Sequence, residues 1–497
     1  MAPDVSGTRT IIRGVGLAGG PVLACVCYLV LPERYTDAAS GGLVPFTAAG
    51  RLTLAVMAWM AVWWLTEAID ISATALLPIA LLPTLGAVSI GEATAPYADK
   101  LIFLFLGGFL LALSMQRWGL DRRIALLTLR LTGDRPAGIV AGIMLATAVM
   151  SMFVSNTATA AMMLPIALSV VALVRRSGGG GGGGNFAVCM MLGIAYAASI
   201  GGVGTKIGSP PNGLVLGFIE QNLGRSIGFV EWLVIAMPLV VVFLPVTWLL
   251  LTRVLYPVPL ERIQGANQLI GDEYGRLGPV KPGEWATFVV FMLTAIAWIT
   301  RPWLAERFVP GLSDAGIVII ASLTLFVIPV DTRTGEFVMN WDTARNVPWG
   351  ILILFGGGLS LAAAVKANGV AEFIGTTVTA LGAVPPIVLV LVVTTTVILL
   401  TEFTSNTATT ATLVPILAAL APGLGVSPYL LIVPAALAAS CAFMMPVATP
   451  PNAIVFGSGE LTIPQMCRAG IWLNLIGVLL ITGLAFVVIV PRLVHSS

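Results

Sequence analysis

Residues 401–409 read TEFTSNTAT, and residues 151–159, which lie 250 positions earlier, read SMFVSNTAT. Both copies place a serine, an asparagine and a threonine among apolar residues, and a helix-forming run that contains a proline follows each copy. We call Ser155-Asn156-Thr157 the first SNT motif and Ser405-Asn406-Thr407 the second SNT motif. Neutral polar groups inside apolar sequence are suited to holding an ion within a membrane, and the repetition predicts that the chain consists of two related halves.

The composition restricts the class of protein. Of the 497 residues, 58% are hydrophobic and only 10% are charged, whereas soluble domains carry about 25% charged residues. A helix that crosses a bilayer needs about 20 apolar residues, so roughly ten or more crossings fit this chain. The sequence therefore predicts an all-α polytopic protein of the cell membrane, and the compact chain favours a bacterial inner membrane.

Several kinds of function are excluded by the residues that the sequence lacks. The single histidine, His495, stands in the C-terminal tail, and the five cysteines show no metal-ligand spacing. No P-loop pattern is present, and a net charge of +2 without a basic block gives no reason to expect nucleic acid as a partner. The sequence therefore predicts a protein that is not an enzyme and that uses no organic cofactor.

A second repeated feature is a proline pair. Ser209-Pro210-Pro211-Asn212 matches Thr449-Pro450-Pro451-Asn452 at an offset of 240, and the glycine tract at residues 178–184, a predicted flexible connector, accounts together with its flanks for the shorter offset. Such runs must unwind a helix, and in lipid an unwound backbone survives only against protein or a watery cavity. Paired interruptions in two halves indicate the binding site of a transporter.

Two further apolar segments correspond between the halves, at residues 101–112 and 351–362, and both contain adjacent glycines. Because the glycines interrupt short apolar runs, we expect each segment to begin a re-entrant hairpin. Residues 121–135 carry four arginines among leucines, so this stretch is predicted to lie on the membrane surface, on the cytoplasmic side.

The chemistry of the SNT motifs favours an anion held together with cations. A helix is expected to begin at Ala158 and at Ala408, and free N–H groups at a helix start favour anions. The motifs contain no lysine or arginine, so a bound cation has to offset the anion, and hydroxyl and carbonyl oxygens suit hard cations. Helix capping alone is the alternative for one motif, but duplication beside matching proline breaks favours a site.

The SNT motifs and the two proline runs closely resemble those of the divalent anion/sodium symporter family of di- and tricarboxylate transporters. The resemblance covers nearly the whole chain and implies inverted repeats, about eleven transmembrane helices, two re-entrant hairpins, a homodimer and elevator motion of a transport domain against a scaffold. It implies scaffold helices at 1–98 and 229–346, and transport-domain halves, each with a hairpin and an SNT motif, at 99–228 and 347–497.

The resemblance also implies residue roles, which we carry over position by position. The substrate is expected to meet the two SNT motifs and the proline runs, namely Ser155, Asn156, Thr157, Ser405, Asn406, Thr407, Ser209, Pro210, Thr449 and Pro450. One sodium is expected at Ser151, Ser155, Asn156 and the Gly208 carbonyl, and a second at Thr401, Thr404, Asn406 and the Ala448 carbonyl.

Together these features predict a sodium-coupled transporter of dicarboxylates of the succinate, malate and fumarate type. The alternatives are a sodium-independent exchanger of the same fold, or a sulfate or citrate transporter. Lys206, two positions before Gly208, is a coupling candidate that replaces a sodium charge, or else it snorkels to the surface. Glu402, beside the second motif, either carries a cation or proton or pairs with a distant basic group.

Overall fold

A computed structural model describes residues 5–36, 42–176, 183–258, 262–263, 265–379 and 384–494. Most of the glycine tract and His495 lie outside these ranges. The elements of the first half are α1 (Val5–Val30), β1 (Arg34–Thr36), β2 (Leu43–Pro45), α2 (Ala48–Thr66), α3 (Ile71–Thr74), α4 (Leu77–Thr84), α5 (Ile90–Thr94), the 3-10 helix η1 (Ala95–Ala98), α6 (Lys100–Trp118), α7 (Leu120–Arg130), α8 (Pro136–Ser151), α9 (Asn156–Arg176), α10 (Gly183–Val203), α11 (Pro210–Leu223), α12 (Phe229–Leu249) and the π-helix η2 (Leu250–Leu255).

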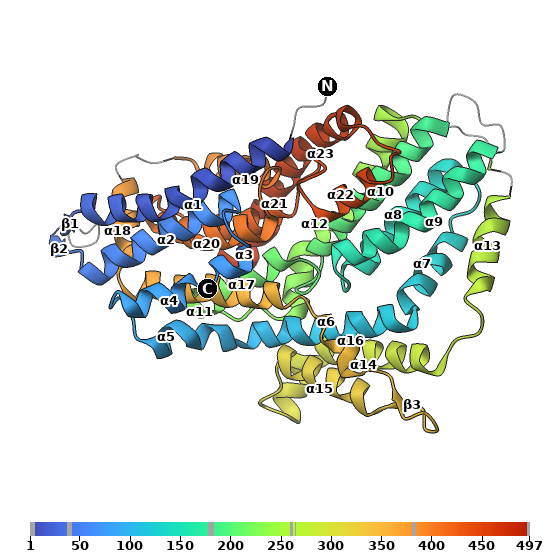
Figure 1. Cartoon of the computed structure of the whole chain (residues 1–497), viewed down its shortest axis with the longest axis horizontal. Helices are drawn as coiled ribbons and strands as arrows, with labels where there is room; N and C mark the ends of the chain where they lie inside the picture. The colour runs from blue at the N-terminus through green and yellow to red at the C-terminus, as the bar shows by residue number, and fades with distance from the viewer. Residues whose placement is uncertain are drawn as a thin grey trace.

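Within the described residues each half ends with seven α-helices followed by a π-helix, and Figure 1 shows how the helices of the two halves are arranged. The elements of the second half are α13 (Ala266–Arg276), α14 (Pro282–Arg307), α15 (Asp314–Val327), β3 (Pro329–Asp331), β4 (Glu336–Phe337), α16 (Trp341–Ala344), α17 (Trp349–Ala367), α18 (Val370–Thr379), α19 (Pro386–Thr401), α20 (Asn406–Gly423), α21 (Pro428–Ala439), α22 (Pro450–Phe456), α23 (Ile463–Leu484) and the π-helix η3 (Ala485–Val494).

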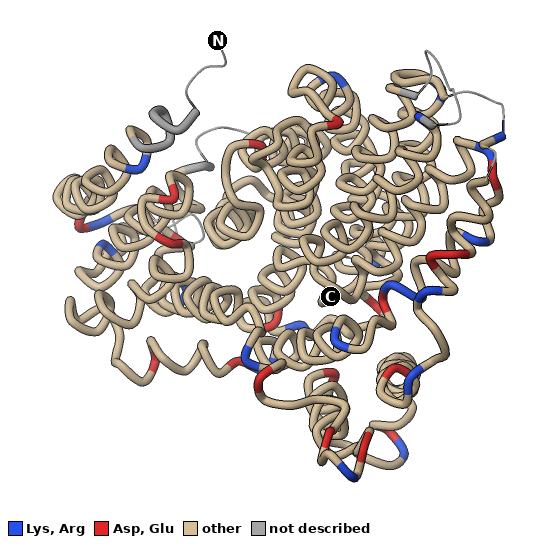
Figure 2. Tube along the Cα trace, turned by 45° about the vertical axis from the view of Figure 1, so that its right-hand side comes forward, with Lys and Arg blue, Asp and Glu red and all other residues tan. Residues whose placement is uncertain are grey.

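Helices account for nearly all of this architecture. Within the described ranges, nine helices are long and apolar enough to cross a membrane, and strands form only two short antiparallel ribbons, β1–β2 and β3–β4. Figure 2 shows a bundle that is mostly free of charge, with lysine, arginine and acidic residues gathered toward its periphery. This distribution is the one that a bilayer imposes, because burying charge in hydrocarbon is costly, and it confirms the predicted all-α polytopic membrane protein.

The expectation that hairpins begin at residues 101 and 351 is wrong. Residue 101 lies in α6 and residue 351 in α17, and each is one continuous helix of 19 residues. The glycines permit close packing instead of a turn: a Cβ on Gly107 would lie 2.5 Å from a Val318 methyl group, and one on Gly357 would lie 2.3 Å from the Ala75 carbonyl oxygen.

The two hairpins carry the SNT motifs at their tips. α8 and α9 are joined by residues 152–155, and α19 and α20 by residues 402–405. The helices after the tips begin at Asn156 and Asn406, two positions earlier than expected. The serine before each one accounts for this, since Ser155 Oγ accepts the Ala158 N–H at 3.3 Å and Ser405 Oγ accepts the Ala408 N–H at 3.4 Å.

Both proline runs lie where a long helix is interrupted, as the sequence predicts. The first break, residues 204–209, separates α10 from α11, and the second break, residues 440–449, separates α21 from α22. Pro210 and Pro450 each stand at the first position of the following helix, where proline loses no intrahelical hydrogen bond. The unwound residues therefore precede the prolines, and Pro210 and Pro450 begin the helices that follow.

Candidate substrate and ion site

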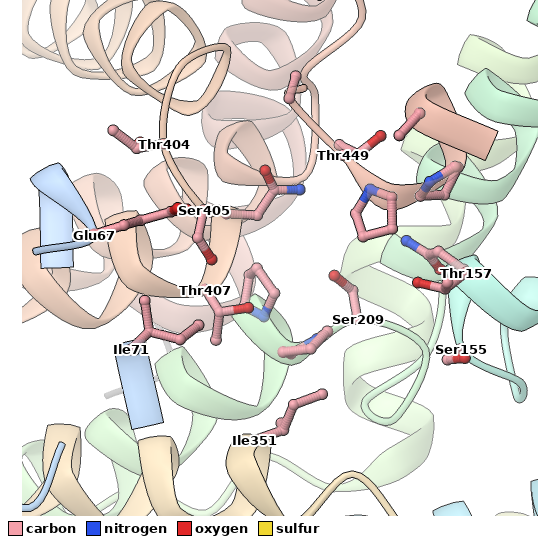
Figure 3. A pocket seen from close by; sticks show the side chains of 18 of the residues that line it. Glu67, Ile71, Ser155, Thr157, Ser209, Ile351, Thr404, Ser405, Thr407 and Thr449 are labelled. Carbon is pink, nitrogen blue, oxygen red and sulfur yellow. The ribbon is translucent and has the colours of Figure 1, made fainter. Parts of the chain in front are cut away.

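The hairpin tips and the two breaks surround one cavity of about 590 Å³. All ten residues expected around the substrate line this cavity. Figure 3 shows Ser405 and Thr407 on one side, Ser155 and Thr157 on the other, and Ser209 between them. Segments that lie 250 positions apart in the sequence thus present hydroxyl groups to a common space.

The remaining wall of the cavity contains residues that sequence reasoning did not select. Its apolar part includes Phe109, Ile351, Phe403 and Val447. Its charged part comprises Arg13, Glu67 and Asp70, and the Arg13 Nη2 atom lies 3.6 Å from Glu67 Oε2. Among the described residues other than glycine, Glu67 alone has a positive φ, of 47°. The two acids at the α2–α3 junction were the feature of the sequence that could have indicated this part of the cavity wall.

The first hairpin gathers oxygen atoms beneath its tip. Ser151 Oγ donates to the Ala198 carbonyl at 2.7 Å. The Asn156 amide atom that faces this group lies 2.5 Å from Ser151 Oγ, 3.2 Å from the Ala198 oxygen and 3.3 Å from the Gly208 oxygen. A nitrogen at that position would donate to these neighbours, whereas an oxygen there could accept only from the Ser151 hydroxyl and would leave oxygens that suit a hard cation. We call the Ser151 hydroxyl, the Asn156 amide and the Ala198 and Gly208 carbonyls the first oxygen cluster.

Glycines allow the first break to approach the hairpin. A Cβ on Gly208 would lie 2.6 Å from the Gly202 oxygen, 2.9 Å from the Met152 oxygen and 3.0 Å from the Ser151 oxygen. A Cβ on Gly202 would lie 2.6 Å from Asn156 Oδ1. The backbone carbonyls can come this close only because both positions lack a side chain.

The second hairpin repeats the arrangement. Thr401 Oγ1 lies 2.6 Å from Asn406 Oδ1 and donates to the Ala439 carbonyl at 3.0 Å. We call these three groups the second oxygen cluster. Thr404 lines the cavity, but its hydroxyl hydrogen-bonds to the Leu400 carbonyl at 2.9 Å and to Thr409 Oγ1 at 2.7 Å.

Two asparagines that sequence reasoning passed over hold the breaks in shape. Asn212 donates to the Gly202, Val203 and Thr205 carbonyls at 2.7–3.2 Å, and Asn452 donates to the Ala442 and Met445 carbonyls at 3.1 and 3.0 Å. Both are fully buried. These bonds satisfy carbonyls that the unwound helices leave free, and the asparagine that ends each proline run was the available signal.

Among the described residues Glu402 has no basic partner, so the predicted pairing with a distant basic group is wrong, whereas the role as a carrier of a proton or cation stays a prediction. Its buried carboxylate accepts the backbone N–H groups of residues 443, 444 and 445 at 2.8–3.0 Å and the Asn474 amide at 2.7 Å. It forms no ion pair within the described ranges. Glu402 therefore ties the second hairpin tip to the second break through backbone donors.

Lys206 does not reach the surface, because it is only 3% exposed. Its Nζ atom donates to Asp314 Oδ2 at 3.0 Å, and Arg301 Nε lies 2.9 Å from the other oxygen of the same carboxylate. Asp314 is the first residue of α15. The snorkelling alternative is thus wrong, and the ammonium group is paired with the first residue of α15.

Two helical hairpins facing two broken helices across one polar cavity define a membrane transporter. The model of the family described as "Sodium:sulfate symporter transmembrane region" matches residues 43–490. The chain belongs to this family, the divalent anion/sodium symporter family that the SNT motifs indicate, and it is a multi-pass cell-membrane protein and not an enzyme.

Similar proteins agree with this assignment. Relatives named sodium-dependent dicarboxylate transporter SdcS, from Staphylococcus aureus strains MW2 and COL, are 43% identical over 439 residues, covering 87% of this chain and 84% of each relative. The Alcanivorax borkumensis YdaH transporter matches with a TM-score of 0.61 at 15% identity, over 96% of this chain and 97% of that chain. Neisseria gonorrhoeae MtrF matches with a TM-score of 0.56 at 13% identity, over 98% and 96%. The two structures show the fold alone.

Proposed function

We propose that this protein carries dicarboxylates across the cell membrane together with sodium ions. The observation that carries the proposal is the placement of the two SNT motifs around one cavity, where each motif offers hydroxyl and amide donors to one carboxylate group. The name of the relatives that are 43% identical supports both the substrate class and the ion.

The charges of the site are compatible with a dicarboxylate that binds together with sodium ions. The ten proposed substrate residues are all uncharged, so a dianion entering them needs positive charge from elsewhere. Each oxygen cluster contains the asparagine of one SNT motif and the hydroxyl side chain five positions before it. Oxygen groups of this kind suit a hard cation such as sodium. Two sodium ions with one dicarboxylate would make a neutral complex, which crosses a low-dielectric region at far lower cost than a dianion.

Thr404 and Ala448 remain part of this proposal as neighbours of the second sodium. Both line the cavity, as Asn406 of the second oxygen cluster does. Lys206 is assigned no place among the cation ligands, because its ammonium group is paired with Asp314.

We further propose that the hairpins and broken helices move together as a transport domain. Ser209 Oγ and Ser440 Oγ hydrogen-bond at 3.1 Å and so join the first break to the second. Elevator motion would carry this unit, with its bound substrate, past the scaffold helices at 1–98 and 229–346. A homodimer would hold the scaffold still in the membrane.

Uptake of labelled succinate into proteoliposomes tests the function. An imposed inward sodium gradient should drive uptake without internal dicarboxylate. Uptake that appears only after the vesicles are preloaded with dicarboxylate would contradict symport and assign exchange. Silence with succinate under both conditions, followed by transport of sulfate or citrate, would contradict the substrate class.

A further inference from the structure

A second cavity, of about 500 Å³, lies at the end of α6, beside α7 and the start of α14. Five cationic side chains line it: Arg117, Arg122, Arg123, Arg276 and Lys281. None of these residues lines the substrate cavity, so the cationic cavity is separate from it.

The position of this cavity is at the boundary of the membrane. α6 and α14 both belong to candidate membrane spans, one ending at Trp118 and the other beginning at Pro282. Trp118 lines the cavity, and Trp285, in the first turn of α14, is 60% exposed. Tryptophans are enriched at the level of lipid headgroups, so the cavity opens where headgroups lie.

The ion pairs around the cavity leave cationic charge in excess. Arg123 is bound through two of its nitrogens by Glu284 and is buried. Arg122 and Arg276 share the single carboxylate of Glu273. One carboxylate therefore neutralises two guanidinium groups.

The cations at the cavity outnumber the carboxylates that line it or pair with its cations. Arg117 pairs with Glu336 at 3.0 Å, and Lys281 forms no ion pair with any described residue. Asp121 also lines the cavity. Five cations against the four carboxylates of Asp121, Glu273, Glu284 and Glu336 leave a surplus of one positive charge.

We propose that this cavity binds the phosphodiester headgroup of an anionic phospholipid. A phosphodiester carries one negative charge, which matches the surplus, and basic pockets at helix ends on the cytoplasmic side suit such headgroups. Trp285, Met292, Leu293, Ile296 and Ile299 form an exposed apolar stripe along α14, and this stripe offers an adjacent path for acyl chains. A free anion has no acyl chains that could pack against that stripe.

The bound lipid would join elements from both halves of the chain. Arg122 belongs to α7, which follows the first half's α6, whereas Lys281 caps the start of α14 in the second half. One phosphate between these two side chains would add to the buried contacts that already join the halves here, which include Arg123 with Glu284 and Ser114 with Thr287.

Native mass spectrometry of the purified protein tests the proposal. The protein is titrated with phosphatidylglycerol or with phosphatidylcholine of the same chain length, and the retained lipid is counted. The test variants are Lys281→Gln and the double variant Arg122→Gln/Lys281→Gln. The control variant is Arg345→Gln, which also removes an exposed arginine that pairs with a nearby acid, Asp342.

The wild-type protein should retain phosphatidylglycerol in preference to phosphatidylcholine. Each removed cation should weaken phosphatidylglycerol binding about fivefold, so the double variant should lose roughly 25-fold, while the control stays unchanged. Equal retention of both lipids by the wild type, or full retention of phosphatidylglycerol by the double variant, would overturn the proposal.

A competition arm distinguishes a lipid from a free anion. Inorganic phosphate or succinate, added at the same concentration as the lipid, should not displace phosphatidylglycerol. Displacement by either would contradict the lipid assignment and make the cavity a site for free anions. Both variants change exposed or half-exposed side chains, and their thermal unfolding in phosphatidylcholine checks that they fold.

Discussion

Lys206 Nζ lies 3.0 Å from Asp314 Oδ2, and this buried pair joins the first break to the first turn of α15. The contact connects the proposed transport domain to the proposed scaffold. An elevator stroke that separates the two would have to break it. The pair therefore offers a direct test of what Lys206 does.

Lys206→Ala should lower stability but leave the sodium dependence of uptake unchanged, because the buried ammonium group is paired with Asp314 and is not a proposed cation ligand. Asp314→Asn should be more harmful, since it leaves Lys206 and Arg301 without their shared carboxylate. Removing one partner of a buried pair costs about 3–5 kcal/mol. Uptake at graded sodium concentrations and thermal unfolding measure the two effects. A changed sodium dependence in Lys206→Ala would restore the lysine to the coupling machinery.

Asn406→Ala should abolish succinate uptake and leave the protein folded. The variant removes the amide that meets Thr401 Oγ1 and lines the substrate cavity. Asn222→Ala is a matched control, because Asn222 donates only within its own helix, to the Phe218 carbonyl at 3.2 Å. Near-normal uptake by Asn406→Ala would mean that the second SNT motif only holds helices together.

Gly208→Ala should raise the sodium concentration needed for half-maximal uptake by about tenfold or more, which corresponds to ~1.4 kcal/mol or more of lost binding. The new Cβ would meet three backbone oxygens at 2.6–3.0 Å and push the first break away from the hairpin. Gly275→Ala serves as the control, since a Cβ there would meet nothing within 4 Å. An unchanged sodium requirement would remove the Gly208 carbonyl from the proposed site.

Glu402→Gln should lower the thermal unfolding temperature and reduce uptake. The carboxylate accepts three backbone N–H groups and an Asn474 amide, and a glutamine would turn its own N–H₂ group toward some of these donors. An unsatisfied buried donor costs about 1–3 kcal/mol. Asn474→Ala removes one of these bonds and should have a smaller effect. Equal stability of Glu402→Gln and the wild type would show that the carboxylate does not support the second break.

Stability should depend on pH through Asp121, at the start of the surface helix α7. Burial raises the pKa of Asp121 from 3.8 to about 6. The folded state thus binds a proton that the unfolded state releases, so stability falls as pH rises from about 4 to about 6.

Asp121→Asn removes this effect. The variant should be more stable than the wild type above pH 6, by up to ~3 kcal/mol, and the difference should disappear near pH 4. Thermal unfolding at a series of pH values measures both proteins. A difference that does not vary with pH would show that burial does not hold the proton on Asp121.

The features that sequence analysis located correctly are those whose physical signal is local. The SNT motifs place polar side chains in apolar surroundings, and the proline runs prevent a regular helix, so both can be identified without knowledge of the fold. The hairpins were misplaced for a related reason. Gly107 and Gly357 resemble breaks in a local window, but they serve contacts with Val318 and Ala75, which are distant in sequence.

The sequence by itself determined the membrane class, the two related halves and the polar motifs that line the central cavity, because apolar composition and repeated polar motifs are properties of short segments. Only the tertiary structure decided the partner of Lys206, the backbone hydrogen-bond donors to Glu402 and the cationic cavity at the end of α6. Each of these depends on groups brought together from separate helices, and a side chain's charge does not specify which distant group will neutralise it.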